Sequence, residues 1–351
     1  MGDSMRPESP EPIPHGGDLD LARRRFPDAP EPWIDLSTGI NPNSYPLPTF
    51  SYDIWRRLPQ SGDFDTLRRV AQRRYGAARP EQIVCAPGTQ SVIQSLPRLI
   101  APSRVCVIGP TYGEHAASWR RAGHDVREAS DLEAARDARV VVVVNPDNPT
   151  GRIFPPDTLC DVARRLARDG GMLVVDEAFA DTAGDDVSVV PALLPSTVVL
   201  RSFGKMYGLA GLRLGFAIAD GDLAKGLRDA LGPWAVSGPA LALGTAALSD
   251  DAWLKRARKR LQDDAARLDS VLADCGCAVI GGTGMFRLVA HSQAARVADV
   301  LGRAGLLVRT FSHAPHWLRF GLPGDEDAWQ RLAEKLETVR GFGDAAVSAG
   351  G

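Results

Sequence analysis

Short runs of apolar residues alternate with amphipathic helical patterns along most of the chain. Five of these runs are predicted to be strands, at residues 82–85, 104–108, 139–144, 172–175 and 197–201. They are apolar at nearly every position, as expected for strands that helices cover on both faces. One helix pattern between them places Leu159, Val162, Ala163 and Leu166 on a single face. The chain therefore predicts an α/β fold with a mainly parallel central sheet between helices.

A long charged helix pattern starts near residue 250, with an apolar stripe through Leu254, Ala257, Leu261, Ala265, Leu268 and Leu272. Beyond it, AVIGGTGMFRLV, LLVRTF and WLRFGL read as strands, and residues 292–304 and 325–340 as helices. These elements predict a smaller α+β domain. We expect a large domain over 45–250, a small domain over 15–44 and 251–351, and a disordered Pro-rich tail over 1–14. The strand-like segment WIDLST (33–38) could join either domain.

Composition narrows the class of protein. The 351 residues carry a net charge of −2, so there is no electrostatic case for nucleic acid or an anionic membrane as a partner. The uncharged run at 230–249 contains two prolines and three glycines and is expected to be buried core rather than a membrane span. No secretory signal is visible. Five cysteines, without metal-site spacing, favour free thiols in a reducing compartment and predict a cytoplasmic protein with no metal site.

Polar residues follow each of the five predicted strands. They are Gly88, Thr89 and Gln90, then Tyr112, Asn148, Asp176 and finally Lys205, which lies in the weakly charged stretch RSFGKMYGLAGLRLG together with Ser202 and Arg213. In an open α/β sheet, ligands bind beyond the carboxyl ends of the strands. We therefore expect these residues to converge on one crevice.

Each of these residues also has an ordinary structural interpretation. Gly88–Gln90 could be a plain helix start, and NPDNPTG around Asn148 could be turn chemistry alone. Asp176 could cap a helix, Tyr112 could be a half-buried core ring, and Lys205 could be solvated. Their order and shared position at strand ends carry the functional interpretation.

Together the residues match the chemical needs of pyridoxal phosphate. That cofactor needs a poorly solvated lysine for its covalent linkage, and a carboxylate facing its pyridine nitrogen. Its phosphate can bind at a helix N-terminus beside an arginine. Its ring can stack on an aromatic side chain, and its phenolic oxygen needs a hydrogen-bond donor. Lys205, Asp176, Gly88–Gln90 with Arg213, Tyr112 and Asn148 fill these roles in turn. No G-x-G-x-x-G follows the first strand, which argues against NAD.

The segments APGTQ, GPTYGEH, NPDNPTGR, VVDEAF and RSFGKMYGLAGLRLG resemble those of the fold type I aminotransferase superfamily, in its histidinol-phosphate aminotransferase-like branch. The resemblance extends from about His15 to about Pro323. It implies a fold type I pyridoxal-phosphate enzyme with a large and a small domain. It also implies a homodimer with active sites near the subunit interface, to which the tract around Trp234 would contribute.

Within that branch, the opening HGG at His15–Gly17 and the later D-x-S-x-x-INP pattern resemble the threonine-phosphate decarboxylases of cobalamin biosynthesis. The ordinary interpretation of this opening is a flexible turn. The resemblance implies decarboxylation of O-phospho-L-threonine to (R)-1-aminopropan-2-yl phosphate and carbon dioxide. It also implies a set of substrate-binding residues: His15, Gly16, Gly39, Asn148, Arg309 and Arg319. Two arginines suit a substrate with both a carboxylate and a phosphate, although either could be a surface residue.

Three positions depart from the branch's usual pattern. Phe179 stands where transaminating relatives have tyrosine, Gly204 replaces a serine that contacts the cofactor phosphate, and Leu58 replaces a tyrosine that reaches the neighbouring subunit. These changes weaken the case for efficient transamination and leave lysine chemistry intact. The alternatives are an aminotransferase of the histidinol-phosphate type and, from another class, a non-catalytic ligand-binding protein.

Overall fold

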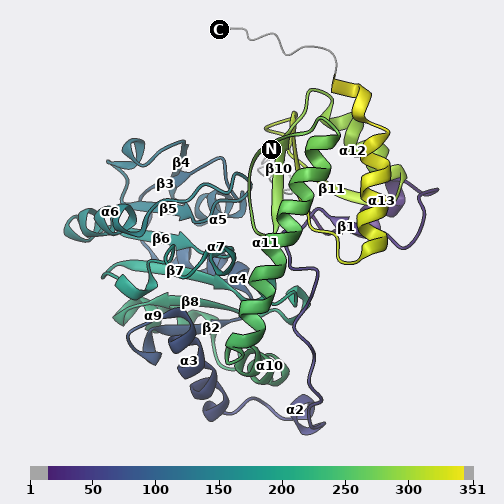
Figure 1. Ribbon diagram of the computed structural model, residues 1–351. Helices are drawn as coiled ribbons and strands as arrows, with labels where there is room; N and C mark the ends of the chain where they lie inside the picture. The colour runs from purple at the N-terminus through teal and green to yellow at the C-terminus, as the bar shows by residue number, and fades with distance from the viewer. Residues whose placement is uncertain (1–14, 344–351) are drawn as a thin grey trace, which may run out of the picture.

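The computed structural model describes residues 15–343, so the tail predicted at 1–14 lies outside the described residues. Two β-sheets organise the chain, and the long helix α11 (Asp251–Asp274) runs past both of them (Figure 1). The Asp250 carboxylate caps this helix by accepting a 2.8 Å hydrogen bond from the backbone N–H of Trp253. Among the described residues, no helix is long and apolar enough to cross a membrane.

The larger sheet has seven strands in the order β2-β8-β7-β6-β5-β3-β4. Only the pairs β2–β8 and β7–β8 are antiparallel, so the predicted mainly parallel sheet is confirmed. In chain order its strands are β2 (Ile83–Ala86), β3 (Arg104–Ile108), β4 (Asp125–Ala129), β5 (Val140–Val144), β6 (Met172–Asp176), β7 (Thr197–Ser202) and β8 (Gly215–Ala219).

Helices cover this sheet on both faces, because alternate side chains of the strands point to opposite sides. Val141 and Val143 of β5 join the core cluster that includes α3, α6 and α10, whereas Val140 and Val142 join the cluster that includes α4, α5 and α9. The helices of this part are α2 (Asp53–Arg56), α3 (Ser61–Tyr75), α4 (Thr89–Ser95), α5 (Glu114–Arg121), α6 (Pro156–Arg168), α7 (Ala180–Ala183), α8 (Phe203–Met206), α9 (Gly221–Leu231) and α10 (Gly238–Leu248).

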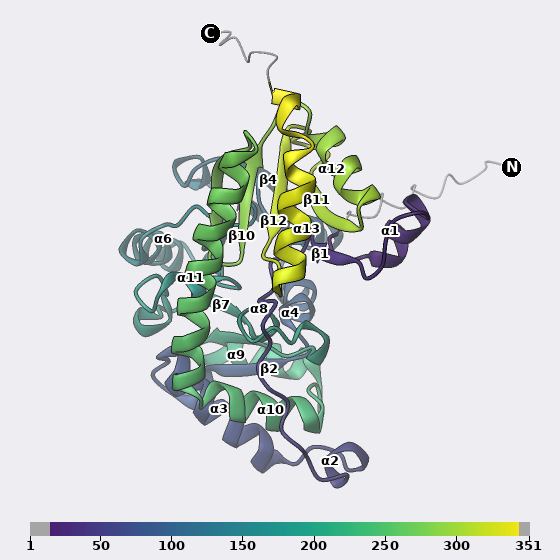
Figure 2. The same ribbon diagram turned by 45° about the vertical axis from the view of Figure 1, so that its right-hand side comes forward.

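The smaller sheet has five strands in the order β1-β11-β12-β10-β9, and α11, α12 and α13 pack beside it (Figure 2). Strand β1 runs parallel to β11, so the segment WIDLST, which could have joined either part, belongs to this sheet. Its elements are α1 (Leu19–Arg25), β1 (Ile34–Leu36), β9 (Ala278–Thr283), β10 (Phe286–Ala290), α12 (Ala294–Arg303), β11 (Leu306–Thr310), β12 (Trp317–Gly321) and α13 (Glu326–Glu337).

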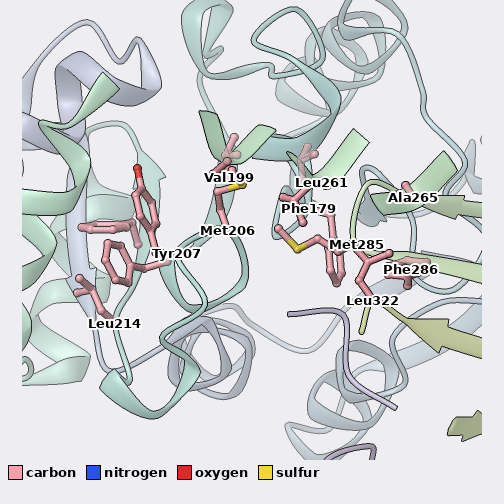
Figure 3. Packing of buried hydrophobic residues seen from close by; sticks show 14 of the residues in the cluster. Phe179, Val199, Met206, Tyr207, Leu214, Leu261, Ala265, Met285, Phe286 and Leu322 are labelled. Atoms are coloured by element: carbon pink, nitrogen blue, oxygen red, sulfur yellow. The ribbon is translucent and has the colours of Figure 1, made fainter. Parts of the chain in front are cut away.

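The two sheets share one continuous apolar core. Phe179, between β6 and α7, packs edge-on against Phe286 of β10 with ring centres 5.2 Å apart. Figure 3 shows this pair beside Met285 and Leu261, the latter on α11. The core therefore fixes the smaller sheet against the carboxyl ends of the larger one.

The structure adds to the predicted elements in three places. Strand β4 was not predicted, because its sequence DVREA is polar and lies at the sheet edge. Strand β8 was not predicted either, because it begins at Gly215 inside a glycine-rich motif. The segment AVIGGTGMFRLV forms two antiparallel strands, β9 and β10, joined by a tight turn at Gly284–Met285.

Candidate active site

Two adjoining cavities open where the strands of the larger sheet end. The inner cavity, of about 180 Å³, is lined by all nine residues predicted to bind the cofactor: Gly88, Thr89, Gln90, Tyr112, Asn148, Asp176, Ser202, Lys205 and Arg213. The outer cavity, of about 480 Å³, is lined by five of the six predicted substrate residues: His15, Gly16, Asn148, Arg309 and Arg319. Lys205, Tyr112 and Asn148 line both cavities, so the two form one site with Lys205 at the junction.

Lys205 is held in a short helix, α8, directly after β7. Its Nζ lies 5.6 Å from the centre of the Phe179 ring. Burial, reinforced by the nearby Arg319 cation and opposed by the Asp176 carboxylate, lowers the pKa of Lys205 to about 8. A substantial fraction of this amine is therefore neutral near neutral pH, which is the form that acts as a nucleophile.

Asp176 ends β6 and is 3% exposed. One carboxylate oxygen, Oδ2, lies 2.9 Å from Nε2 of the buried His115, and the other accepts a 3.0 Å hydrogen bond from the backbone N–H of Ala178. Both oxygens are thus fixed in orientation. The carboxylate can face a protonated ring nitrogen without turning away.

Tyr112 presents its ring to both cavities. Its hydroxyl donates a 3.1 Å hydrogen bond to Gln90 Oε1, and Gln90 Nε2 donates to Glu114 Oε2 at 2.9 Å. Burial, reinforced by the Glu114 charge, raises the pKa of Tyr112 to about 12, so the ring is neutral at physiological pH. The chain of hydrogen bonds fixes a neutral aromatic face in the inner cavity.

Gly88 and Arg213 form an anion-binding cradle at the start of α4. A Cβ at Gly88 would lie 2.7 Å from Arg213 Nη2, so only glycine lets the guanidinium approach the backbone here. Arg213 itself has a left-handed φ of 54° and donates from Nη1 to the carbonyl of Ala210 at 3.2 Å. A guanidinium beside the first N–H groups of a helix suits a phosphate. The cradle, the neutral tyrosine, the fixed carboxylate and the half-buried lysine together fit pyridoxal phosphate.

Arg319 and Arg309 lie opposite each other on β12 and β11. Arg319 is 6% exposed; its Nη1 donates to Asn148 Oδ1 and its Nη2 donates to the carbonyl of Ser37 at 2.6 Å. Burial, together with the Arg309 charge, lowers the pKa of Arg319 to about 9, and burial also lowers the pKa of Arg309. Two neighbouring cations in a partly dry cavity favour a ligand with more than one negative charge.

The bond from Arg319 also orients Asn148. Because Asn148 Oδ1 accepts from the arginine, its Nδ2 faces the opposite way and is available to donate. This arrangement suits the donor predicted for the cofactor's phenolic oxygen, since Phe179 cannot supply one.

The N-terminal residues His15 and Gly16 line the outer cavity, and Gly17 follows them. Gly17 donates its backbone N–H to Ser37 Oγ at 2.7 Å, and the backbone carbonyl of Ser37 accepts a hydrogen bond from Arg319. Gly39, the remaining residue predicted to bind substrate, lines neither the inner nor the outer cavity. It lies behind them, where a Cβ would be 2.9 Å from Phe179 and 2.8 Å from Phe286.

The structure gives a steric reason for the unusual Gly204. A Cβ at this position would lie 2.7 Å from Cα of Ala210, in the loop that carries Arg213. The backbone of this loop therefore occupies the space that a serine would need. Leu58, another departure, is 59% exposed and lines neither cavity.

Gly204→Ser is expected to destabilise the fold by about 1–3 kcal/mol, since the crowded side chain must displace backbone. It should also weaken pyridoxal phosphate binding, because the displaced loop holds Arg213. Thermal unfolding and cofactor titration measure both effects. Gly211→Ser is the matched control, as a Cβ there meets nothing within 4 Å. Equal stability of the two variants, with tighter cofactor binding in Gly204→Ser, would contradict this account.

Sequence reasoning missed His115, Glu114 and Ser37. His115 follows Tyr112 by three residues, a spacing that places both on one face of a helix start, and this signal was available. Glu114 and Ser37 gave no comparable signal, because the contacts that tie them to the site come from distant parts of the chain: His15 and Gln90 for Glu114, and Arg319 for Ser37.

The comparisons with known proteins agree with this geometry. The model for aminotransferase class I and II matches residues 57–336. The chain belongs to the class I and II aminotransferase family. Members of this family depend on pyridoxal phosphate, and this chain is accordingly a pyridoxal-phosphate enzyme of fold type I.

Several relatives of this aminotransferase-family chain have curated names. A threonine-phosphate decarboxylase from Pseudomonas aeruginosa is 42% identical over 92% of this chain and 97% of its own length. A threonine-phosphate decarboxylase from Sinorhizobium sp is 43% identical over 93% of this chain and 98% of its own length. A histidinol-phosphate aminotransferase from Oleidesulfovibrio alaskensis is 30% identical over 82% of each chain.

Solved structures show the same fold. A histidinol-phosphate aminotransferase from Sinorhizobium meliloti, in complex with pyridoxal-5'-phosphate, has a TM-score of 0.76 at 22% identity and covers 97% of this chain and 99% of its own. An L-threonine-O-3-phosphate decarboxylase from Porphyromonas gingivalis has a TM-score of 0.72 at 19% identity and covers 86% and 98%. At these identities the likeness concerns the fold alone.

Proposed function

We propose that this enzyme decarboxylates O-phospho-L-threonine to (R)-1-aminopropan-2-yl phosphate and carbon dioxide, as a step in cobalamin biosynthesis. The observation that carries the proposal is the pair of relatives at 42% and 43% identity, both named threonine-phosphate decarboxylase. The facing arginines of the outer cavity support it independently, because this substrate carries a carboxylate and a phosphate.

Pyridoxal phosphate, when bound, supplies the electron sink that accepts the pair left by a breaking bond at Cα. Lys205 would hold the cofactor covalently and Asp176 would hold the proton on its ring nitrogen. Tyr112 would cover the ring. Gly88, Thr89, Gln90, Ser202 and Arg213 would bind its phosphate end, and Asn148 its phenolic oxygen.

The substrate's orientation decides which bond at Cα breaks. Arg309 and Arg319 would bind the two anionic groups, with His15 and Gly16 closing over them and Gly39 shaping the wall behind. The half-buried amine of Lys205, with a pKa of about 8, suits the return of a proton to Cα after carbon dioxide leaves. Phe179 in place of a hydroxyl-bearing side chain leaves the cofactor's phenolic oxygen to Asn148, unlike in transaminating relatives.

Substrate comparison tests this assignment. O-phospho-L-threonine should be turned over, whereas L-threonine, which lacks the phosphate, and L-histidinol phosphate, which lacks the carboxylate, should not. Phosphorus NMR of the product mixture identifies aminopropanol phosphate. Productive turnover of histidinol phosphate with 2-oxoglutarate would instead favour an aminotransferase, and a purified protein that binds no pyridoxal phosphate would favour a non-catalytic binder.

The lowered pKa of Lys205 predicts the pH dependence of cofactor uptake. The neutral amine is the reacting form, so the rate at which apoenzyme captures pyridoxal phosphate should rise about tenfold per pH unit below pH 8 and level off above it. Stopped-flow absorbance from pH 6 to 10.5 gives the profile. A rate that keeps rising toward pH 10.5, the ordinary value for lysine, would show that the site does not lower this pKa.

We propose further that the enzyme is a homodimer. The segment around α2 exposes Tyr52, Trp55 and Leu58, and Trp234 lies exposed beside Pro59 in a shared apolar hollow. Large aromatic rings left in water favour a protein partner, and the family resemblance makes that partner a second copy.

Trp55→Asp combined with Leu58→Asp should convert the dimer to monomer at micromolar concentration, because two buried apolar contacts are replaced by charge. Size-exclusion chromatography with light scattering measures the mass. Ile280→Asp is the control, since Ile280 is exposed on β9 of the smaller sheet. A wild-type mass of one chain would refute the dimer.

We also propose a cytoplasmic location. All five cysteines are free and buried, which suits a reducing compartment. Cell fractionation with an antibody to the chain tests this, and recovery outside the cytoplasmic fraction would contradict it.

A further inference from the structure

Glu114, the first residue of α5, occupies an unusual place beside the active site. It is 7% exposed and lines neither cavity, yet three side chains from three different segments point at its carboxylate. These are His15 from the N-terminal segment, Gln90 from α4 and Arg121 from the end of α5. A buried carboxylate is retained at little cost only when donors satisfy it, and these three do so.

The two oxygens of Glu114 have different partners. Oε1 lies 3.1 Å from Nε2 of His15, while Oε2 accepts from Gln90 Nε2 at 2.9 Å and from Arg121 Nη2 at 3.2 Å. A carboxylate only accepts hydrogen bonds, so His15 Nε2 carries the proton on this side and Nδ1 is the nitrogen left for the outer cavity. Glu114 therefore determines both the position and the orientation of the imidazole.

On its other side, Glu114 supports the aromatic face of the inner cavity. Gln90 donates to Glu114 and accepts from the Tyr112 hydroxyl at 3.1 Å, so the amide cannot turn over without losing both bonds. The Tyr112 and His15 rings also lie near each other, with centres 6.0 Å apart. The Glu114 carboxylate thus holds two side chains in position: His15, which lines the outer cavity, directly, and Tyr112, which lines both cavities, through Gln90.

We propose that Glu114 is a positioning residue that couples substrate binding by His15 to cofactor binding by Tyr112. It holds the imidazole over the outer cavity through Oε1 and the Gln90–Tyr112 pair in the inner cavity through Oε2. The first half of the inference rests on the proposed function, because it takes His15 to contact the phosphorylated substrate. The second half concerns the cofactor alone.

The test is a double-mutant cycle between His15→Ala and Glu114→Gln, which is nearly isosteric. For each variant, KM and kcat are measured with O-phospho-L-threonine, and the dissociation constant of pyridoxal phosphate is measured by titrating apoenzyme. Glu133→Gln is the matched control, since Glu133 forms an exposed pair with Arg136 away from both cavities. Thermal unfolding confirms that each variant is folded.

His15→Ala should raise KM about 10–100-fold, as for loss of a charge-assisted hydrogen bond, and leave cofactor affinity unchanged. Glu114→Gln should raise KM similarly and weaken pyridoxal phosphate binding several-fold, with kcat less affected. The double variant should have the KM of His15→Ala within about twofold. Additive effects on KM, or a Glu114→Gln enzyme with wild-type KM and cofactor affinity, would overturn the proposal.

Two further outcomes are distinguishable. If Glu114→Gln does not fold, Glu114→Asp keeps the charge but is one methylene shorter, and the same cycle applies with the same expectations. If wild-type enzyme releases no carbon dioxide from the substrate, the proposed function fails. In that case the cofactor titration alone decides the inference, since unchanged affinity in Glu114→Gln would overturn it.

Discussion

Lys205→Ala is expected to lower kcat/KM for O-phospho-L-threonine by about 10⁴-fold or more, the scale found when an enzyme loses its covalent catalytic group. The reason is positional as well as chemical, because Lys205 is the one lysine of residues 15–343 that lines either cavity. The lowered pKa of about 8 lets Lys205 exist in part as the neutral, reactive amine. An arginine cannot replace it, because its guanidinium would stay charged. Turnover assays and the visible absorbance of the cofactor-loaded protein measure the loss.

Lys225→Ala serves as the control, because Lys225 lies exposed on α9 in a surface pair with Asp229. It should retain wild-type activity and absorbance. If Lys205→Ala still turns over substrate at more than about a hundredth of the wild-type rate, Lys205 is not the catalytic lysine.

Arg319→Ala is expected to lower kcat/KM by about 10²–10³-fold, mainly through KM. This substitution removes a buried cation and leaves Asn148 Oδ1 and the Ser37 carbonyl without their donor. Truncating one partner of a buried charged pair costs about 2–5 kcal/mol, and a bound anion would be that partner here. Arg319→Lys should recover only part of the loss, because an ammonium cannot donate to both acceptors and an anion in one plane.

Arg287→Ala tests whether such a loss is merely structural. Arg287 lies on β10 of the same sheet and pairs with Asp269 at 2.5 Å, outside both cavities. It should reduce thermal stability with little change in KM. If Arg319→Ala and Arg287→Ala reduce kcat/KM to the same degree, Arg319 is not a substrate-binding residue.

The central site was predictable because parallel strands present their carboxyl ends at one edge. Asp176 and Lys205 are 29 residues apart in the chain, yet both follow buried apolar runs, and adjacent parallel strands place them side by side. The same rule placed Tyr112 and Asn148. Gly88 was predicted from its position before a helix, and the structure shows that its missing Cβ leaves room for Arg213.

Other features depended on contacts that no local pattern encodes. Glu114 looks like an ordinary acidic first-turn residue, and only the approach of the N-terminal segment and α4 makes it a shared acceptor. Strand β4 has the sequence of a charged surface segment, because it lies at the sheet edge with few buried side chains. Gly39 was predicted as a substrate contact, whereas its place between Phe179 and Phe286 follows from how the two sheets pack.

The most direct test follows carboxyl-labelled O-phospho-L-threonine with the purified, cofactor-loaded enzyme, with and without 2-oxoglutarate. A decarboxylase should release labelled carbon dioxide at the same rate in both reactions, form one aminopropanol phosphate per carbon dioxide, and produce no glutamate. Glutamate formed in step with substrate loss, with the label retained in a keto acid, would contradict the decarboxylase and establish an aminotransferase in its place.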